Sequence, residues 1–215
     1  HVVFALDRAG VVGEDGETHQ GVFDLAYLLP MPGMEILAPR DYRELRHMLR
    51  HSVFVSKGPV AIRYPRGPER TPPECGDLPT LPVSQAQILR SGDSLTIASC
   101  GAMARNALLA ASLLESEGIS CEVIDIRRVK PLDTDTIIAS CLKTGRIVTL
   151  EDGVAIGGFG SVMAAWIASH HPCIPVAVIA AGDHPILQGS VSRIHTREGM
   201  DPSSIAQACR ELMTL

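Results

Sequence analysis

The chain has 215 residues, 46% of them hydrophobic, and a formal net charge of −5. This length and apolar content suffice for a buried core, and they predict a globular protein of one large or two small domains. The acidic balance argues against nucleic acid or an anionic membrane as a partner, and the sequence has no apolar run of about twenty residues, so we expect a cytoplasmic location.

The first predicted element is a strand over residues 2–6, a continuous apolar run of the kind buried in a parallel sheet. Because His1 is not a start methionine, we expect the chain to be a piece of a longer protein. A short helix is predicted over residues 22–29, where prolines end it, and a second strand over residues 34–38. This region is expected to leave a strand edge that another chain could pair with.

The next helix begins at Asp41, which can act as its N-cap while Glu44 completes a capping box. Leu45, Met48 and Leu49 predict one apolar face. The other positions of this helix include five arginines and histidines, which we interpret as its solvated face and not as a nucleic-acid surface. They are Arg43, Arg46, His47, Arg50 and His51.

A third strand is predicted over residues 59–63 and leads into the segment Tyr-Pro-Arg-Gly at residues 64–67. Prolines and polar residues then dominate residues 68–83, a composition that favours neither a helix nor a central strand. The domain boundary is therefore predicted there.

The second region alternates strands and helices. Strands are predicted over residues 95–99, 120–126, 146–150 and 174–179, and helices over residues 102–117, 134–142, 161–169 and 202–213. Gly118 is the expected end of the first of these helices. The alternation predicts a mostly parallel sheet with helices on both faces, whose ligands lie beyond the carboxyl ends of the strands.

The segment at residues 7–23 has the composition of a site, since its glycines let the backbone pass close to a ligand and its polar groups are closely spaced. Arg8 follows the first strand and Arg66 follows the third, so in a parallel sheet both lie at the same edge. Two guanidinium groups there suit a phosphate. The alternative for each is a surface charge or an interdomain ion pair.

Asp15 and His19 lie four residues apart in the same segment. An imidazole can transfer a proton or donate to a carbonyl or hydroxyl oxygen, and a carboxylate can accept from a sugar hydroxyl. The alternative is a loop histidine that bonds only to the backbone or caps a helix.

Two further patterns receive mainly structural interpretations. The glycine turn at residues 157–160 precedes a helix and could bind an anion, but such turns are ordinary, and Glu151 and Asp152 before it are expected to serve the turn or a subunit contact. The six cysteines are scattered, which favours reduced, buried thiols over a metal site or disulfides.

Four motifs together resemble the 1-deoxy-D-xylulose-5-phosphate synthases, a group of transketolase-like enzymes that depend on thiamine diphosphate. They are Asp-Arg-Ala-Gly at residues 7–10 with Gly-Glu-Asp-Gly-Glu-Thr-His-Gln at residues 13–20, Tyr-Pro-Arg-Gly at residues 64–67, Lys-Pro-Leu-Asp at residues 130–133, and Gly-Gly-Phe-Gly-Ser at residues 157–161. The resemblance covers the whole chain.

The resemblance implies an α/β fold in three parts. Residues 1–72 would be the C-terminal part of a pyrimidine-binding domain, with a parallel sheet and helices on both faces. Residues 73–83 would be a proline-rich linker, and residues 84–215 a transketolase C-terminal domain with α/β/α layers.

The resemblance also implies a reaction, in which pyruvate loses carbon dioxide and is joined to glyceraldehyde 3-phosphate for the synthesis of isoprenoid precursors, thiamine and pyridoxal. By motif position, Arg8 and Arg66 would bind the acceptor phosphate, while Asp15 and His19 would contact the intermediate or the acceptor hydroxyls. The full-length enzyme would be a homodimer that uses thiamine diphosphate and Mg²⁺. The family's main cofactor residues precede the matched region, so this chain alone is expected to be inactive.

Two alternatives remain open from the sequence. The chain could belong to another transketolase-like enzyme, such as transketolase itself or the beta subunit of a 2-oxoacid dehydrogenase. It could also serve as a non-catalytic dimerisation module.

Overall fold

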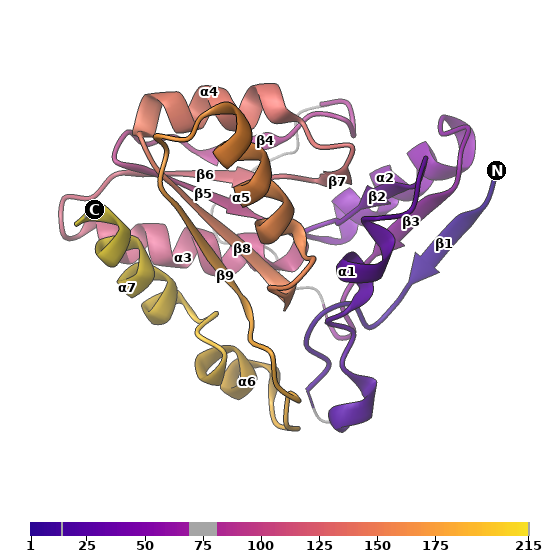
Figure 1. Cartoon of the computed structure of the whole chain (residues 1–215). Coiled ribbons are helices and arrows are strands. Elements are labelled where there is room, and N and C mark those ends of the chain that lie inside the picture. Colours follow the sequence, from indigo (N-terminus) through magenta and orange to yellow (C-terminus); the bar gives the residue numbers. More distant parts are fainter. Residues whose placement is uncertain (14, 69–80, 215) are drawn as a thin grey trace.

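The computed structural model describes residues 1–13, 15–68 and 81–214, which form two sheets flanked by helices (Figure 1). Most of the predicted linker at residues 73–83 lies outside these described residues. None of the described helices is long and apolar enough to cross a membrane.

The first sheet has the strand order β1-β3-β2-β7. Strands β1 (Val3–Leu6), β3 (Val60–Arg63) and β2 (Glu35–Leu37) run parallel, whereas β7 (Arg128–Lys130) pairs antiparallel with β2. The sequence did not predict β7, which comes from the second half of the chain. The two halves are therefore joined by main-chain pairing as well as by side-chain packing.

Strand β1 lies at the edge of its sheet and is not enclosed by it. Phe4 is 43% exposed, and among the strands of the described residues only β3 pairs with this one. The prediction of a fully buried strand is wrong, because an apolar run needs neighbours on both sides to be buried as in an α/β interior. The prediction of an exposed strand edge is confirmed.

The second sheet has the order β4-β6-β5-β8-β9. Its parallel strands are β6 (Cys121–Asp125), β5 (Leu95–Ser99), β8 (Ile147–Val154) and β9 (Val176–Ala181), and β4 (Gln87–Arg90) is an antiparallel edge strand that was not predicted. Every residue of β5 is buried, as expected for the central strand of a doubly covered sheet.

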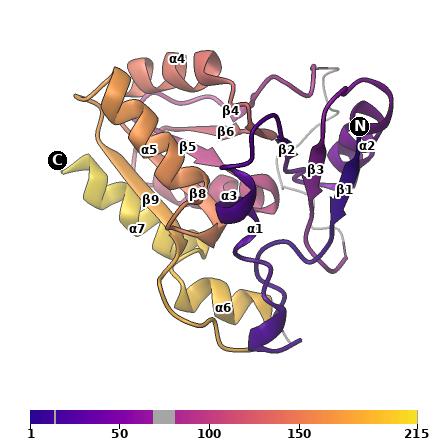
Figure 2. The ribbon, with the colours of Figure 1, turned by 45° about the vertical axis from the view of Figure 1, so that its right-hand side comes forward.

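Helices cover both faces of this second sheet (Figures 1 and 2). One face packs against α3 (Ala104–Glu115) and α7 (Pro202–Met213), through residues such as Leu108 and Ile205. The other packs against α4 (Thr134–Thr144) and α5 (Phe159–His170). The predicted layered α/β architecture is confirmed.

The remaining helices border the first sheet and the loops. They are α1 (Asp24–Leu28), α2 (Tyr42–Phe54), α6 (Val191–Arg197) and the short 3-10 helices η1 (Glu17–His19) and η2 (Gly101–Met103). The sequence did not predict α6. The core around α4 and α5 also includes Leu25, Ile36 and Ala61 from the first region, so one apolar cluster spans both sheets.

The start of α2 differs in part from the expected capping box. Asp41 accepts from the backbone N–H of Glu44 at 2.8 Å, as predicted. The Glu44 carboxylate instead accepts from Nε of Arg127 at 3.0 Å, because a buried guanidinium is the stronger partner. Leu49 is 45% exposed, so the buried line of α2 runs through Glu44, Met48 and Ser52.

Candidate functional site

The parallel pairing of β1 with β3 brings two loops to one edge of the first sheet. Leu6 is in register with Arg63, so the chain leaves both strands at the same level. The backbone N–H of Ala9 donates to the carbonyl of Tyr64 at 3.0 Å and joins the two loops. Arg8 and Arg66 therefore lie near each other for the reason expected from the sequence.

The segment after β1 closes on itself as a tight loop. Gly10 and Gly21 exchange two backbone hydrogen bonds of 2.8 Å each. A Cβ atom on Gly21 would lie 1.8 Å from the carbonyl oxygen of Arg8, so this crossing requires glycine. The outer part of the loop reaches α6, where the N–H of Gly189 donates to the carbonyl of Gly13 at 3.3 Å (Figure 2).

Arg8, Arg66 and Asp15 form one charged cluster on this edge. Nη1 of Arg66 donates to Oδ2 of Asp15, and Nη1 of Arg8 lies 3.7 Å from the same oxygen. The hydrogen bond from Arg66, with the charges of Arg66, Arg8 and His19, lowers the pKa of Asp15 below its usual value. Asp15 is thus an anion in contact with both guanidinium groups.

His19 lies at the end of η1 with its side chain exposed. Its Nδ1 is 3.1 Å from Oγ1 of Thr18, and its charge contributes to the lowered pKa of Asp15. The structure thus brings all four predicted site residues to one region of the surface. Their roles in binding and catalysis stay predictions.

A buried ion cluster that the sequence did not reveal supports this edge from below. Nε of Arg63 donates to Asp24 at 2.7 Å, and its Nη2 donates to Asp152 at 2.9 Å. Burial by itself would lower the pKa of Arg63, but Asp152 and Asp24 outweigh it and hold the pKa well above its usual value. The cluster ties β3, α1 and β8 together beneath the loop, where a Cβ on Gly10 would collide with Asp152.

The N-terminus of α5 is occupied by the chain's own carboxylate. Glu151 accepts from the backbone N–H groups of Phe159 at 3.1 Å and Gly160 at 2.7 Å. The prediction that Glu151 serves the turn is confirmed, and the alternative of a ligand anion at this glycine turn loses its support. Asp152 instead pairs with Arg63.

Replacing Glu151 by glutamine is expected to change how stability depends on pH. Burial raises the pKa of Glu151 from 4.5 to about 7, so the folded state holds this proton more tightly than the unfolded state. Its contribution to stability is complete below the unfolded pKa and is lost as the pH rises through the folded pKa. The wild type should lose about 3 kcal/mol relative to Glu151→Gln between pH 4.5 and pH 7.5.

Urea unfolding of both proteins at several pH values measures this difference. Glu17→Gln, a change at an exposed residue, serves as the control and should leave the pH dependence unchanged. A constant difference between wild type and Glu151→Gln across this range would contradict the raised pKa.

The described residues contain no group of three or more His, Cys, Asp and Glu side chains that could hold a metal ion. Four of their cysteines are buried, as predicted, and Cys173 is exposed, while Cys75 lies outside the described residues.

Comparison with known proteins gives consistent matches along the chain. The transketolase pyrimidine-binding domain matches residues 1–70, and the transketolase C-terminal domain matches residues 84–205. The solved "Split gene transketolase, inactive beta4 tetramer" is similar over 100% of this chain and 67% of that chain, with a TM-score of 0.85 and 29% identity.

Two curated relatives are named 1-deoxy-D-xylulose-5-phosphate synthase. The one from Gloeobacter violaceus is 41% identical over 214 residues, which are 99% of this chain and 34% of that relative. The one from Heliobacterium modesticaldum is 44% identical over 211 residues, or 98% of this chain and 32% of that relative. The chain thus spans about a third of the length of these relatives.

Proposed function

The chain belongs to the transketolase family, and from this premise we propose that it is part of a 1-deoxy-D-xylulose-5-phosphate synthase. The proposed reaction joins pyruvate, with loss of carbon dioxide, to glyceraldehyde 3-phosphate. Two curated relatives of that name, at 41% and 44% identity over nearly the whole chain, support the proposal. The predictions of a cytoplasmic location and of no nucleic-acid partner rest on composition.

The observation that carries this proposal is the pairing of two guanidinium groups on one carboxylate. Arg8 and Arg66 come from separate loops, yet both approach Oδ2 of Asp15. An arrangement that holds one oxyanion with two arginines can hold another, and a phosphate offers more acceptor oxygens in the same place. We assign the phosphate of the aldehyde acceptor to this pair.

Asp15 and His19 then act on the rest of the acceptor. When the phosphate takes over the two guanidinium groups, the Asp15 carboxylate is released and can accept from a hydroxyl of the acceptor. His19 has an exposed imidazole that can donate a proton to the aldehyde oxygen as it gains negative charge.

Thiamine diphosphate would supply the stabilised carbanion formed from pyruvate. The accompanying Mg²⁺ would need a cluster of metal-binding side chains, and the described residues contain none. The described part of the chain therefore does not fit a metal-diphosphate site. We propose that the residues that hold the cofactor and its metal lie in the part of the enzyme that this chain does not span, and that the chain alone is inactive. Its own residues contribute acceptor binding and proton placement.

Replacing Asp15 by asparagine is expected to tighten binding of phosphorylated ligands. The substitution removes the carboxylate that competes with phosphate for Arg8 and Arg66, and an exposed ion pair of this kind corresponds to a change of about 1.4-fold to fivefold in affinity. Calorimetric titration with inorganic phosphate, which has no sugar hydroxyl that could donate to Asp15, measures the change, and glyceraldehyde 3-phosphate is titrated beside it. The same titration with unphosphorylated glyceraldehyde should give no saturable heat.

Glu17→Gln, in the same loop, is the matched control and should bind like the wild type. Equal affinities of wild type and Asp15→Asn for inorganic phosphate, or equal binding of the two aldehydes, would contradict the assignment of the phosphate to the arginine pair.

A second function, self-association, is favoured by the exposed apolar surface beside α1. Phe23 is 59% exposed, Tyr27 52% and Ile156 70%. Phe23 and Ile156 border a groove of about 560 Å³. The structural relative is described as a tetramer. We propose that copies of this chain dimerise through the exposed apolar surface formed by Phe23, Tyr27 and Ile156. Light scattering that shows a strict monomer at high concentration would overturn this proposal.

A further inference from the structure

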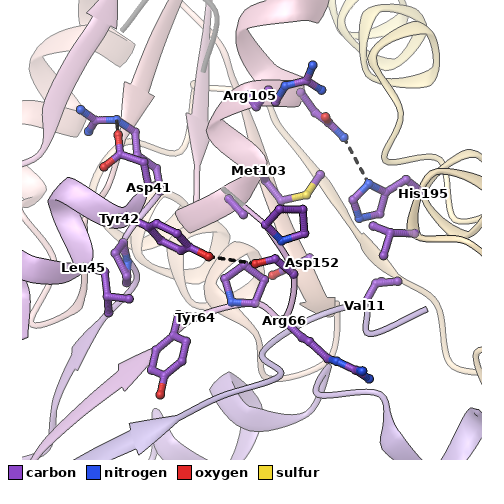
Figure 3. A pocket seen from close by; sticks show the side chains of 18 residues that line it. Val11, Asp41, Tyr42, Leu45, Tyr64, Arg66, Met103, Arg105, Asp152 and His195 are labelled. Carbon is purple, nitrogen blue, oxygen red and sulfur yellow. Dashed lines mark hydrogen bonds and ion pairs between the residues drawn. The ribbon is translucent and has the colours of Figure 1, made fainter. Parts of the chain in front are cut away.

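We propose that the cavity between the two halves of the chain is a second anion site, which binds a small phosphate-bearing metabolite with Arg105 as its counter-charge. The cavity has a volume of about 100 Å³. The first half of the chain contributes Tyr42, Leu45 and Tyr64 to its wall, and the second half contributes Met103, Arg105 and His195 (Figure 3). The acceptor site proposed above does not include Arg105 or His195.

Both acidic groups of this cavity have an arginine partner. Two aspartates line it, Asp41 and Asp152. Oδ2 of Asp41 lies 3.5 Å from Nε of Arg40, and Oδ1 of Asp152 accepts from Arg63 at 2.9 Å. Each of these carboxylates therefore contacts a guanidinium group, which it shares with a second carboxylate: Asp125 at Arg40 and Asp24 at Arg63.

The arginines of the wall differ in whether their charge is balanced. Arg40 donates to Asp125 at 2.7 Å, and Arg66 is paired with Asp15. Arg105, in the first turn of α3, is half-buried and forms no ion pair with the part of the chain that the structure describes. A half-buried guanidinium without a carboxylate partner favours an anionic ligand.

Two polar side chains beside Arg105, Asn106 and His195, are held in place by hydrogen bonds. Nδ2 of Asn106 donates to the carbonyl of Met200 at 2.8 Å and lies 3.4 Å from Nδ1 of His195. These contacts hold the imidazole of His195 on the side of the cavity where Arg105 lies, as Figure 3 shows. An anion there would meet the Arg105 guanidinium beside the Asn106 amide and the His195 imidazole.

The size and lining of the cavity limit the ligand. A volume of about 100 Å³ has room for a small ligand that carries a phosphate group. Tyr42, Tyr64 and Met103 supply apolar surface on the wall. A phosphate ester with a short carbon chain matches both properties.

The cavity shares a wall with the proposed acceptor site. The hydroxyl of Tyr42 donates to the carbonyl of Gly67 at 3.0 Å, next to Arg66. Figure 3 shows the Arg66 side chain directed away from Tyr42 and Leu45. An occupant of the cavity would touch the loop that carries Arg66, so the two sites are expected to be coupled. This coupling, unlike the anion site itself, rests on the proposed function.

Calorimetric titration of the 215-residue chain with inorganic phosphate and with glycerol 3-phosphate tests the site. We expect two saturable sites in the wild type. Arg105→Gln should weaken one of them at least tenfold, Arg105→Lys should weaken it less, and Arg46→Gln, on the exposed face of α2, should change neither. Tighter binding of glycerol 3-phosphate identifies an ester as the ligand, and equal binding identifies free phosphate.

Arg8→Gln separates this proposal from the acceptor assignment, because it should remove the other site only. If Arg105→Gln titrates like the wild type while Arg8→Gln loses binding, the second site is overturned and the acceptor site stands. If only Arg105→Gln loses binding, the acceptor assignment fails and the second site stands. Absence of any saturable phosphate binding overturns both.

Discussion

Arg63→Leu is expected to lower the free energy of unfolding by about 3–5 kcal/mol, the range for removing one partner of a buried ion pair. Arg63 is 3% exposed and lies between Asp24 and Asp152 at 2.7 and 2.9 Å. Leucine fills much of the space but leaves two buried carboxylates without a counter-charge. Urea unfolding followed by circular dichroism measures the loss.

A compensating variant shows whether unbalanced charge causes the loss. Replacing Asp24 and Asp152 by asparagine in the Arg63→Leu protein should recover a large part of the stability, because neither of the two buried aspartate charges remains. Arg46→Leu, on the exposed side of α2, should change the free energy of unfolding little. A loss below about 1 kcal/mol for Arg63→Leu would show that the cluster does not hold β3, α1 and β8 together.

The double substitution of Arg8 and Arg66 by alanine is expected to lower kcat/KM for glyceraldehyde 3-phosphate by about 100- to 1000-fold in the enzyme that contains this chain. Each arginine supplies charge-assisted hydrogen bonds to the phosphate, and the loss of each corresponds to roughly tenfold or more. Steady-state kinetics with the phosphorylated and unphosphorylated aldehydes measures the effect. The activity with unphosphorylated glyceraldehyde should change less than about threefold.

Each single variant should have an intermediate effect, since either arginine can still contact the phosphate. Arg46→Ala is the matched control, because it removes an arginine from the same half of the chain outside the site. An equal loss of activity with both aldehydes would mean that the arginines support the loop and do not recognise phosphate.

The meeting of Arg8 and Arg66 could be predicted because it follows from the topology of parallel strands. Two apolar runs that pair in parallel deliver the residues after their carboxyl ends to one edge, whatever the loops contain. The contact of both arginines with Asp15 could not be predicted in the same way. It depends on the path of the loop, which the crossing of Gly10 and Gly21 fixes.

The buried ion cluster and the short edge strands escaped prediction for a different reason. Arg63 ends an apolar strand and Asp24 begins a helix, and each is compatible with a surface position until its partner in space is known. Strand β7 has only three residues, of sequence Arg-Val-Lys, so it has no apolar periodicity to detect. Glu44 satisfies the sequence rule for a capping box, but tertiary contact with Arg127 overrides it.

The cavity around Arg105 depends on contacts between distant parts of the sequence. Its wall combines Tyr42 and Tyr64 with Arg105 and His195, which no local pattern connects. What the sequence did predict was the domain-scale arrangement of parallel strands and covering helices in which such a cavity forms.

The most direct test of the assigned function is a substrate profile of the enzyme that contains this chain, with thiamine diphosphate and Mg²⁺ supplied. Product analysis by mass spectrometry should show that pyruvate and glyceraldehyde 3-phosphate are consumed together, with release of carbon dioxide and formation of one five-carbon ketose phosphate. Transfer of two-carbon units between sugar phosphates without consumption of pyruvate would contradict the assignment and indicate a transketolase instead.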